Sequence, residues 1–210
     1  MIDIFSLSAN KLVEKLKAGE VSSVEVCTQY IDRIKNFEKD VKAWAHFDKK
    51  ELLEKAAEAD EYRKSGKPLG ALHGLPVAVK DIIGTLDMPT ECGTVIRKKM
   101  TGSQEAEVVN LLKIAGAIIM GKTETTELAY FHPGKTTNPH DYSRTPGGSS
   151  SGSAAAVAVA PTDDDRFEQM LAGLEMSVMK AATYENCVRQ YFDSPALGGP
   201  PDKPVMVSRW

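Results

Sequence analysis

The sequence predicts an α/β protein in which helices pack against a sheet. A helical pattern over 105–115 ends at Gly116 and is followed at once by an apolar strand over 117–120. A second apolar strand, over 77–81, follows a turn at 73–76. Helices and strands that alternate at this spacing are typical of layered α/β architectures.

The N-terminal region is predicted to be helical. A helix over 8–18 would begin at the capping residue Ser8 and end at Gly19, because glycine readily adopts the positive φ of a helix C-terminus. Ser22 and Glu25 have the spacing of a capping box, so a second helix is expected to start at Ser22.

The elements between these regions follow the same rules. Apolar and polar residues alternate over 43–48, which predicts a short strand. Asp48 and Glu51 then begin a third helix, which is expected to end near Ser65 and Gly66.

The later part of the chain reads as loop and helix. Residues 131–148 are rich in proline, glycine and asparagine and are expected to form a loop. The apolar run 154–160 suits a buried helix. Thr162 and Asp165 can cap a last helix, and the tail is expected to be irregular.

Composition and charge exclude several classes of protein. The 26 Lys and Arg against 29 Asp and Glu give a formal net charge of −3, so the chain lacks the basic face that nucleic-acid binding needs. No run of apolar residues is long enough to span a bilayer, and no secretory signal is visible. We therefore expect neither nucleic acid nor a membrane among its partners.

The cysteines and histidines predict neither a disulfide framework nor a metal site. Cys27, Cys92 and Cys187 are far apart and form no CxxC pair, which favours reduced thiols in a cytoplasmic protein. The four histidines lack the spacing of metal ligands.

One motif suggests nucleotide binding. Residues 116–123 match the GxxxxGK[ST] pattern of a phosphate-binding loop. That loop needs a strand before it, a flexible middle and a helix after it. Here a helix precedes the motif, and the apolar residues 117–120 favour a buried strand. A P-loop nucleotidase is therefore only the third-ranked function.

A glycine- and serine-rich stretch over 147–153 runs into the apolar residues 154–157. Such a stretch can be a flexible linker, although a linker would not lead directly into a compact apolar helix. A tight turn at the start of a helix instead presents hydroxyl and N–H groups that stabilise negative charge. We therefore interpret 147–153 as part of a functional site.

Lys80 stands near the end of the apolar strand 77–81, beside Asp81. By itself this pattern favours a surface lysine at a strand end, because lysines are rarely buried. The alternative is a lysine held partly out of water. Desolvation would lower its pKa and allow it to act as a base.

Three segments together resemble the amidase signature family: 72–81, 115–124 and 146–157, which occur in the family's order. The similarity extends from about residue 7 to residue 160. It implies an α/β fold with a mixed twisted sheet covered by helices, here truncated and with an N-terminal helical region. It also implies hydrolysis of a carboxamide C–N bond in a small-molecule substrate.

The resemblance assigns catalytic roles through the family's Ser–Ser–Lys triad. By motif position, Lys80 matches the catalytic lysine and Ser149 the bridging serine, which in the family sits on a cis peptide bond. Lys80 would take a proton from Ser149, which would relay one from the attacking serine. No metal or organic cofactor is implied. The remaining serines are expected to act as caps and turn hydrogen bonds: Ser150, Ser151 and Ser153.

The family's attacking serine has no counterpart in this sequence. In the family it lies beyond the bridging serine, in a second Gly-Gly-Ser turn followed by arginine. The other Gly-Gly pair here, at 198–199, is followed by proline, and the later serines lack such a turn. Instead, 163–192 is loosely similar to a helix that family members carry much later.

We interpret this pattern as an internal deletion after Ala160. Residues 1–160 would be the N-terminal portion of an amidase signature domain, and 161–210 a helix and irregular tail from a distal part of it. Without its nucleophile a catalytic unit loses most of its rate enhancement, so hydrolysis is expected to be impaired. Lost strands would expose edges and apolar faces, which predicts a chain that is marginally stable, prone to associate with a copy of itself, or in need of a partner protein.

Two functions therefore rank above the nucleotidase. The first is an amide hydrolase of this family, impaired in this form. The second is a catalytically inactive remnant that acts as a binding or assembly module. In that case the methionine stripe of 163–192 would dock a partner. The sequence does not identify the substrate.

Overall fold

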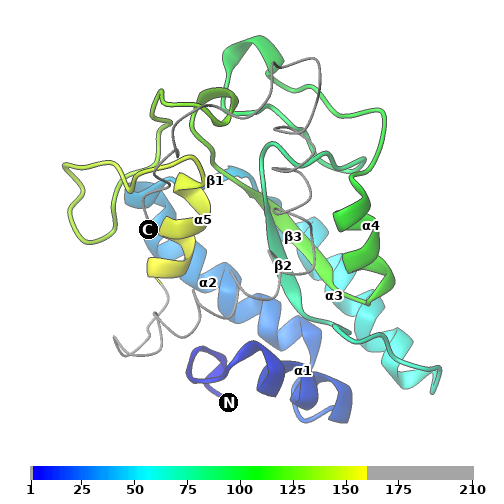
Figure 1. Cartoon of the computed structure of the whole chain (residues 1–210). Coiled ribbons are helices and arrows are strands. Elements are labelled where there is room, and N and C mark those ends of the chain that lie inside the picture. Colours follow the sequence, from blue (N-terminus) through cyan, green and yellow to red (C-terminus); the bar gives the residue numbers. More distant parts are fainter. Residues whose placement is uncertain (1, 160–210) are drawn as a thin grey trace, which may run out of the picture. The chain divides into compact units, whose positions relative to one another are not determined.

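The computed structural model describes residues 2–159, and Figure 1 shows the arrangement of their helices and strands. The α/β architecture expected from the sequence is confirmed. In chain order the elements are η1 (Ile4–Ser6), α1 (Ala9–Ala18), α2 (Ser23–Val41), β1 (Trp44–His46), α3 (Lys49–Lys64), β2 (Pro76–Lys80), η2 (Val95–Arg97), α4 (Glu107–Ile114), β3 (Ile118–Thr123), η3 (Glu127–Ala129) and α5 (Ser151–Ala158). The predicted last helix and the tail lie outside the described residues.

The strands form a mixed three-stranded sheet with β3 in the middle, in the order β1-β3-β2. β1 pairs with β3 in the antiparallel sense and β2 pairs with it in the parallel sense. A register shift in the parallel pair places Val79 opposite Lys122 and Lys80 opposite Thr123. Lys80 therefore stands at the end of its strand, beside the end of the central strand.

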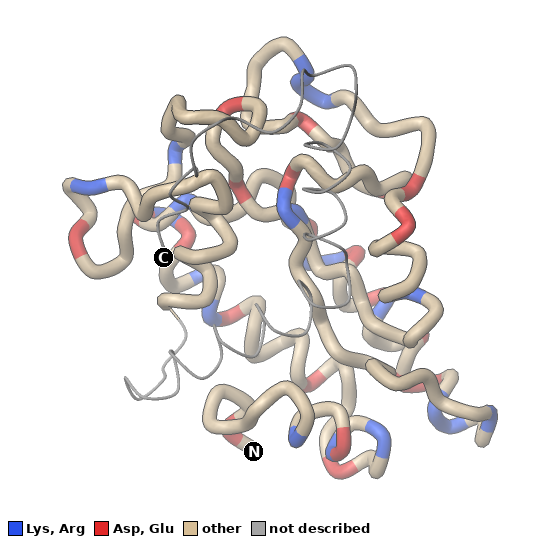
Figure 2. Tube along the Cα trace, in the orientation of Figure 1, with Lys and Arg blue, Asp and Glu red and all other residues tan. Residues whose placement is uncertain are grey.

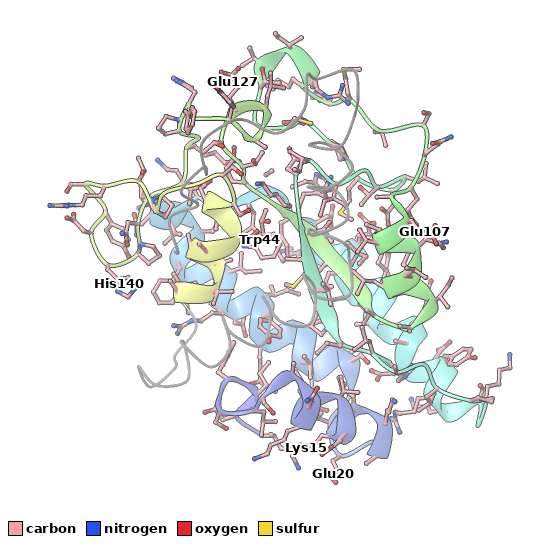
Figure 3. All side chains as sticks on the ribbon, in the orientation of Figure 1. Lys15, Glu20, Trp44, Glu107, Glu127 and His140 are labelled. Carbon is pink, nitrogen blue, oxygen red and sulfur yellow. The ribbon has the colours of Figure 1, made fainter. Side chains whose placement is uncertain are left out.

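Helices pack against both faces of this sheet. Val79 and Ile119 pack with Val109 of α4. Ile118 and Met120 pack in a cluster with residues of α2, α3 and α5. Figure 1 shows α4 and α5 on opposite sides of the two parallel strands. Trp44, labelled in Figure 3, belongs to the same cluster as α5.

The helix starts follow the sequence signals closely. Ser8 and Asp48 accept hydrogen bonds from the first turns of α1 and α3, and both bonds of the Ser22–Glu25 capping box are present. Gly19 ends α1 with a φ of 74°. These local contacts satisfy backbone groups that the helices cannot satisfy themselves.

Two expected boundaries are wrong. The apolar strand continues beyond Met120 to Thr123, and α5 begins at Ser151 rather than at Ala154. The N–H groups of a first helical turn have no partner within the helix, and the N–H of Gly152 donates to the Glu124 carbonyl instead. The buried strand expected in place of a phosphate-binding loop is confirmed, because 118–123 form a strand whose residues are all buried.

The described surface carries charges of both signs. Figure 2 shows acidic and basic residues interspersed along this part of the chain. Within residues 2–159, no helix is both long and apolar enough to cross a bilayer.

Asp60 joins two of the helices that support the sheet. It lies in α3, is 6% exposed, and accepts hydrogen bonds from the N–H groups of Ser23 (2.7 Å) and Val24 (3.1 Å). A carboxylate is favoured at a helix N-terminus, where N–H groups are free and the helix dipole is positive. Asp60 therefore caps α2 from a neighbouring helix.

Replacing Asp60 with alanine is expected to lower the free energy of unfolding by about 2–4 kcal/mol, because one buried and one partly buried N–H group lose their charged acceptor. Urea unfolding followed by circular dichroism measures this change. Glu58→Ala is the matched control. It removes an exposed carboxylate from the same helix and should change stability by less than about 0.5 kcal/mol. Equal midpoints for the two variants would contradict the role of Asp60.

Candidate active site

The side chains of Lys80 and Ser149 meet at the end of β2. The Lys80 Nζ donates a hydrogen bond of 2.6 Å to the Ser149 Oγ, and the contact is partly buried. Ser149 lies in the loop before α5, and the Gly148–Ser149 peptide bond is cis. The structure thus brings together the two residues that the sequence singled out, with the peptide geometry that the resemblance implied.

The surroundings of Lys80 favour its neutral form. Its side chain is half-buried, and burial lowers the pKa of its amine, because a charged group loses hydration when water is excluded. Helix α5 packs against β2 and has the sequence SGSAAAVA, which carries no charge. A neutral amine beside a hydroxyl can accept its proton, so this pair can act as base and relay.

The chain that follows β3 holds the Ser149 loop in place. The N–H of Thr126 and the hydroxyl of Thr125 both donate to the Ser149 carbonyl oxygen, each over 3.0 Å. The hydroxyls of Thr123 and Ser153 lie 2.6 Å apart. Sequence reasoning missed these threonines. The available signal was the group of threonines at 123, 125 and 126, where an apolar run ends.

Helix α5 begins at a crossing of three backbone segments. The N–H of Gly152 donates to the Glu124 carbonyl (3.0 Å), and the N–H of Glu124 donates to the Ala43 carbonyl (2.8 Å). A Cβ atom at position 152 would lie 2.2 Å from the Ala43 oxygen and 2.3 Å from the Glu124 nitrogen. Glycine is therefore required for α5 to approach the sheet this closely.

The expected roles of the other serines are wrong. Ser150 is the N-cap residue of α5, but its ψ of 45° is not extended and its side chain makes no capping bond. The buried Ser151 hydroxyl has no hydrogen-bond partner. Ser153 lies inside the helix and contacts Thr123 of β3.

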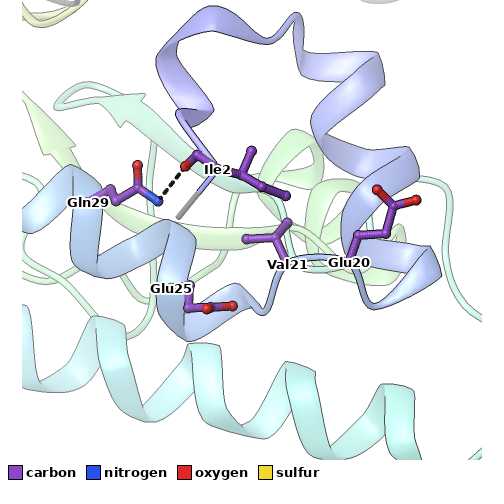
Figure 4. Close-up of a pocket in the computed structure, with 5 residues that line it drawn as sticks. All are labelled: Ile2, Glu20, Val21, Glu25 and Gln29. Carbon is purple, nitrogen blue, oxygen red and sulfur yellow. Dashed lines mark hydrogen bonds between the residues drawn. The ribbon is translucent and has the colours of Figure 1, made fainter.

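Two surface pockets lie away from this pair. One, of about 350 Å³, is drawn in Figure 4 and is lined by residues of the N-terminal segment and the start of α2: Ile2, Glu20, Val21, Glu25 and Gln29. Another, of about 670 Å³, is lined by residues of α3, α4 and the start of β3. Among residues 2–159, no group of three or more His, Cys, Asp or Glu side chains is placed to hold a metal ion.

Comparison with known proteins gives a consistent match. The family model described as Amidase matches residues 25–162. The glutamyl-tRNA(Gln) amidotransferase subunit from Salinispora tropica is 40% identical over 168 residues, which cover 77% of this chain and 34% of that protein. The chain thus spans about a third of the length of this curated relative.

Solved structures agree with the sequence match. The peptide amidase of Stenotrophomonas maltophilia has a TM-score of 0.68 and 32% identity, covering 75% of this chain and 35% of that one. A fatty acid amide hydrolase has a TM-score of 0.68 and 31% identity, covering 75% of this chain and 29% of that one.

Replacing Gly152 with alanine is expected to destabilise the protein by roughly 1–3 kcal/mol, because the added methyl group overlaps backbone atoms that cannot move independently. Urea unfolding measures the change. Ala154→Ser is the control, since residue 154 is exposed on the same helix and should alter stability by less than about 0.5 kcal/mol. A Gly152→Ala protein as stable as this control would refute the close approach of α5.

Proposed function

The chain belongs to the amidase family, and from this we propose that it carries the base and the relay of a site that hydrolyses a carboxamide C–N bond. The hydrogen bond of 2.6 Å between Lys80 and Ser149 is the observation that carries the proposal. The partly buried setting supports it, because a base that works near neutral pH needs a lysine whose charged form is disfavoured.

Proton transfer in this proposal runs through Ser149. Neutral Lys80 takes the proton of the Ser149 hydroxyl, while Ser149 takes the proton of the attacking serine. The attacking oxygen bonds to the amide carbon, the C–N bond breaks, and the proton returns through Ser149 to the leaving amine. Water then hydrolyses the acyl-enzyme by the same relay. Every proton taken by Lys80 is given back within one turnover.

We propose that the nucleophile is missing from these 210 residues. Beyond Ser149, the pair 198–199 is the sequence's only Gly-Gly, and a proline follows it. In this proposal, 1–160 is the N-terminal portion of an amidase domain and 161–210 comes from a distal part of the same domain. The family match over residues 25–162 supports the first part of this division.

The second candidate function is a binding or assembly module. The curated relatives are by name subunits of an amidotransferase, which favours a protein partner for this chain. Large apolar side chains of η2 and of the chain after η3 are exposed, namely Val95 (84%), Ile96 (83%) and Phe131 (82%). Exposed apolar surface of this kind is typical of interaction sites.

We also propose a cytoplasmic location. Cys27 and Cys92 are free thiols, which suits a reducing compartment.

The purified 210-residue chain is expected to release no amine from simple aliphatic and aromatic carboxamides above the rate without protein, because base and relay have no nucleophile to activate. Colorimetric amine release measures turnover, and mass spectrometry after treatment with a fluorophosphonate detects a reactive serine. Turnover that disappears in Lys80→Ala would contradict the missing nucleophile, while turnover that persists in this variant would contradict the role of Lys80.

The amine of Lys80 is expected to react with acetic anhydride at lower pH in the folded chain than in urea. The reason is that burial lowers its pKa, so the reactive neutral form is present below the value of about 10.4 typical of free lysine. Labelling rates of the Lys80 peptide, measured by mass spectrometry across pH, give both midpoints. Identical midpoints in the folded and unfolded chains would rule out Lys80 as the base.

A further inference from the structure

A second lysine of the same region is buried completely and has no part in the proton relay. Lys122 lies in β3, and its Nζ is 3.3 Å from the Oδ1 of Asp81; the two side chains are 0% and 2% exposed. The Nζ also donates to the Pro89 carbonyl (3.0 Å) and to the Thr90 hydroxyl (2.7 Å). All three contacts come from chain outside its own strand.

Asp81 is held from several directions at once. Its carboxylate oxygens lie 3.3 Å and 3.1 Å from the N–H of Glu91, which donates to them. Its own N–H donates to the Thr123 carbonyl, and its carbonyl accepts from the N–H of Cys92, each over 3.0 Å. The ion pair therefore ties the segment 89–92 to the ends of β2 and β3.

This ion pair and the proposed base occupy opposite faces of the sheet. Successive side chains of a strand point to opposite faces, so Lys122 and Thr123 diverge, and Asp81 contacts Lys122. Thr123 stands opposite Lys80 in the register and contacts α5 through Ser153, whereas Lys122 stands opposite Val79. The face that carries Lys122 is thus the one that packs against α4.

Stability alone does not account for the pair. Burial raises the pKa of Asp81 and lowers the pKa of Lys122, and their mutual attraction opposes both shifts. Removing two charges from water is costly, and apolar residues of similar volume often support a fold equally well. What the pair does supply is a fixed geometry, because each charged atom is bonded to defined partners.

We propose that Lys122 and Asp81 are positioning residues for Lys80. They fix the end of β2 from one face of the sheet, so that on the other face the amine of Lys80 meets Ser149. This inference rests on the proposed function of Lys80 as a base. Without the pair, the segment 89–92 loses its anchor, water reaches the strand end, and the amine is no longer held against the hydroxyl.

Besides Asp81, the groups that act on Lys122 include Cys92 and Asp87. Helix α5 carries no charge. Asp81 and Lys122 compensate each other, and Glu91 stands beside Asp81. Glu124 is paired with Lys135 at 3.2 Å. Altering the Asp81–Lys122 pair therefore changes the support of the base while leaving the other charges in place.

The test compares the labelling midpoint of Lys80 in the unaltered chain with that in the double variant Asp81→Asn/Lys122→Met, which removes both charges and keeps the side-chain volumes close. We expect the midpoint to rise by about one pH unit, so that labelling at pH 8 slows roughly tenfold. Urea unfolding of the same sample reports whether the variant is folded. A folded double variant with an unchanged midpoint would overturn the proposal.

If the double variant is unfolded, a milder variant tests whether the Asp81–Lys122 pair positions Lys80. Thr90→Val removes one acceptor of Lys122 with little change of shape, and we expect labelling of Lys80 at pH 8 to slow about threefold, roughly half a pH unit. An unchanged rate would overturn the proposal. Val109→Ala, which opens space in the same face of the sheet, is the control for a general loss of stability and should leave the midpoint unchanged. An equal shift of the Lys80 midpoint in Val109→Ala would show that the Asp81–Lys122 pair acts only through general stability, and this would overturn the proposal.

These outcomes separate the two proposals. If Lys80 of the unaltered chain has the same labelling midpoint when folded as in urea, the proposal that Lys80 is the base is wrong. If the unaltered chain shows the lowered midpoint and neither the double variant nor Thr90→Val moves it, the base stands and only the positioning role is overturned.

Discussion

The partly buried hydrogen bond between the Lys80 amine and the Ser149 hydroxyl is the interaction that the surrounding structure supports. Parallel strands β2 and β3 end side by side and set the position of Lys80. Thr125 and Thr126 hold the backbone of Ser149 from the end of β3. Gly152 lets α5 approach closely enough to bring the serine loop onto the sheet. These contacts act together, because the hydrogen bond forms only when both Lys80 and Ser149 are held in position.

Local signals in the sequence predicted most of the fold. Ser8, Ser22 and Asp48 cap helices as their types and spacings indicate, because such bonds depend on only a few neighbouring residues. The end of β3 was harder to predict, since Lys122 is charged and only tertiary contacts with Asp81 and Thr90 make its burial tolerable. A one-dimensional pattern does not contain those contacts.

The candidate site was predictable only through the family resemblance. Taken alone, Lys80 reads as a surface residue, and nothing in the spacing of 80 and 149 indicates that they meet. The motif blocks supplied that link, and the structure places the two side chains in contact. The threonines and the buried ion pair stayed unnoticed, because their importance lies in backbone acceptors and register rather than in a motif. The absence of a second Gly-Gly-Ser turn, by contrast, is visible in the sequence alone.

A crystal structure of the 210-residue chain at mildly alkaline pH would test the contact between Lys80 and Ser149 most directly. We expect the Lys80 Nζ to lie within hydrogen-bond distance of the Ser149 Oγ, near 2.6 Å, with the amine screened from water by α5. An amine that points into solvent, with the serine hydroxyl bonded elsewhere, would contradict it.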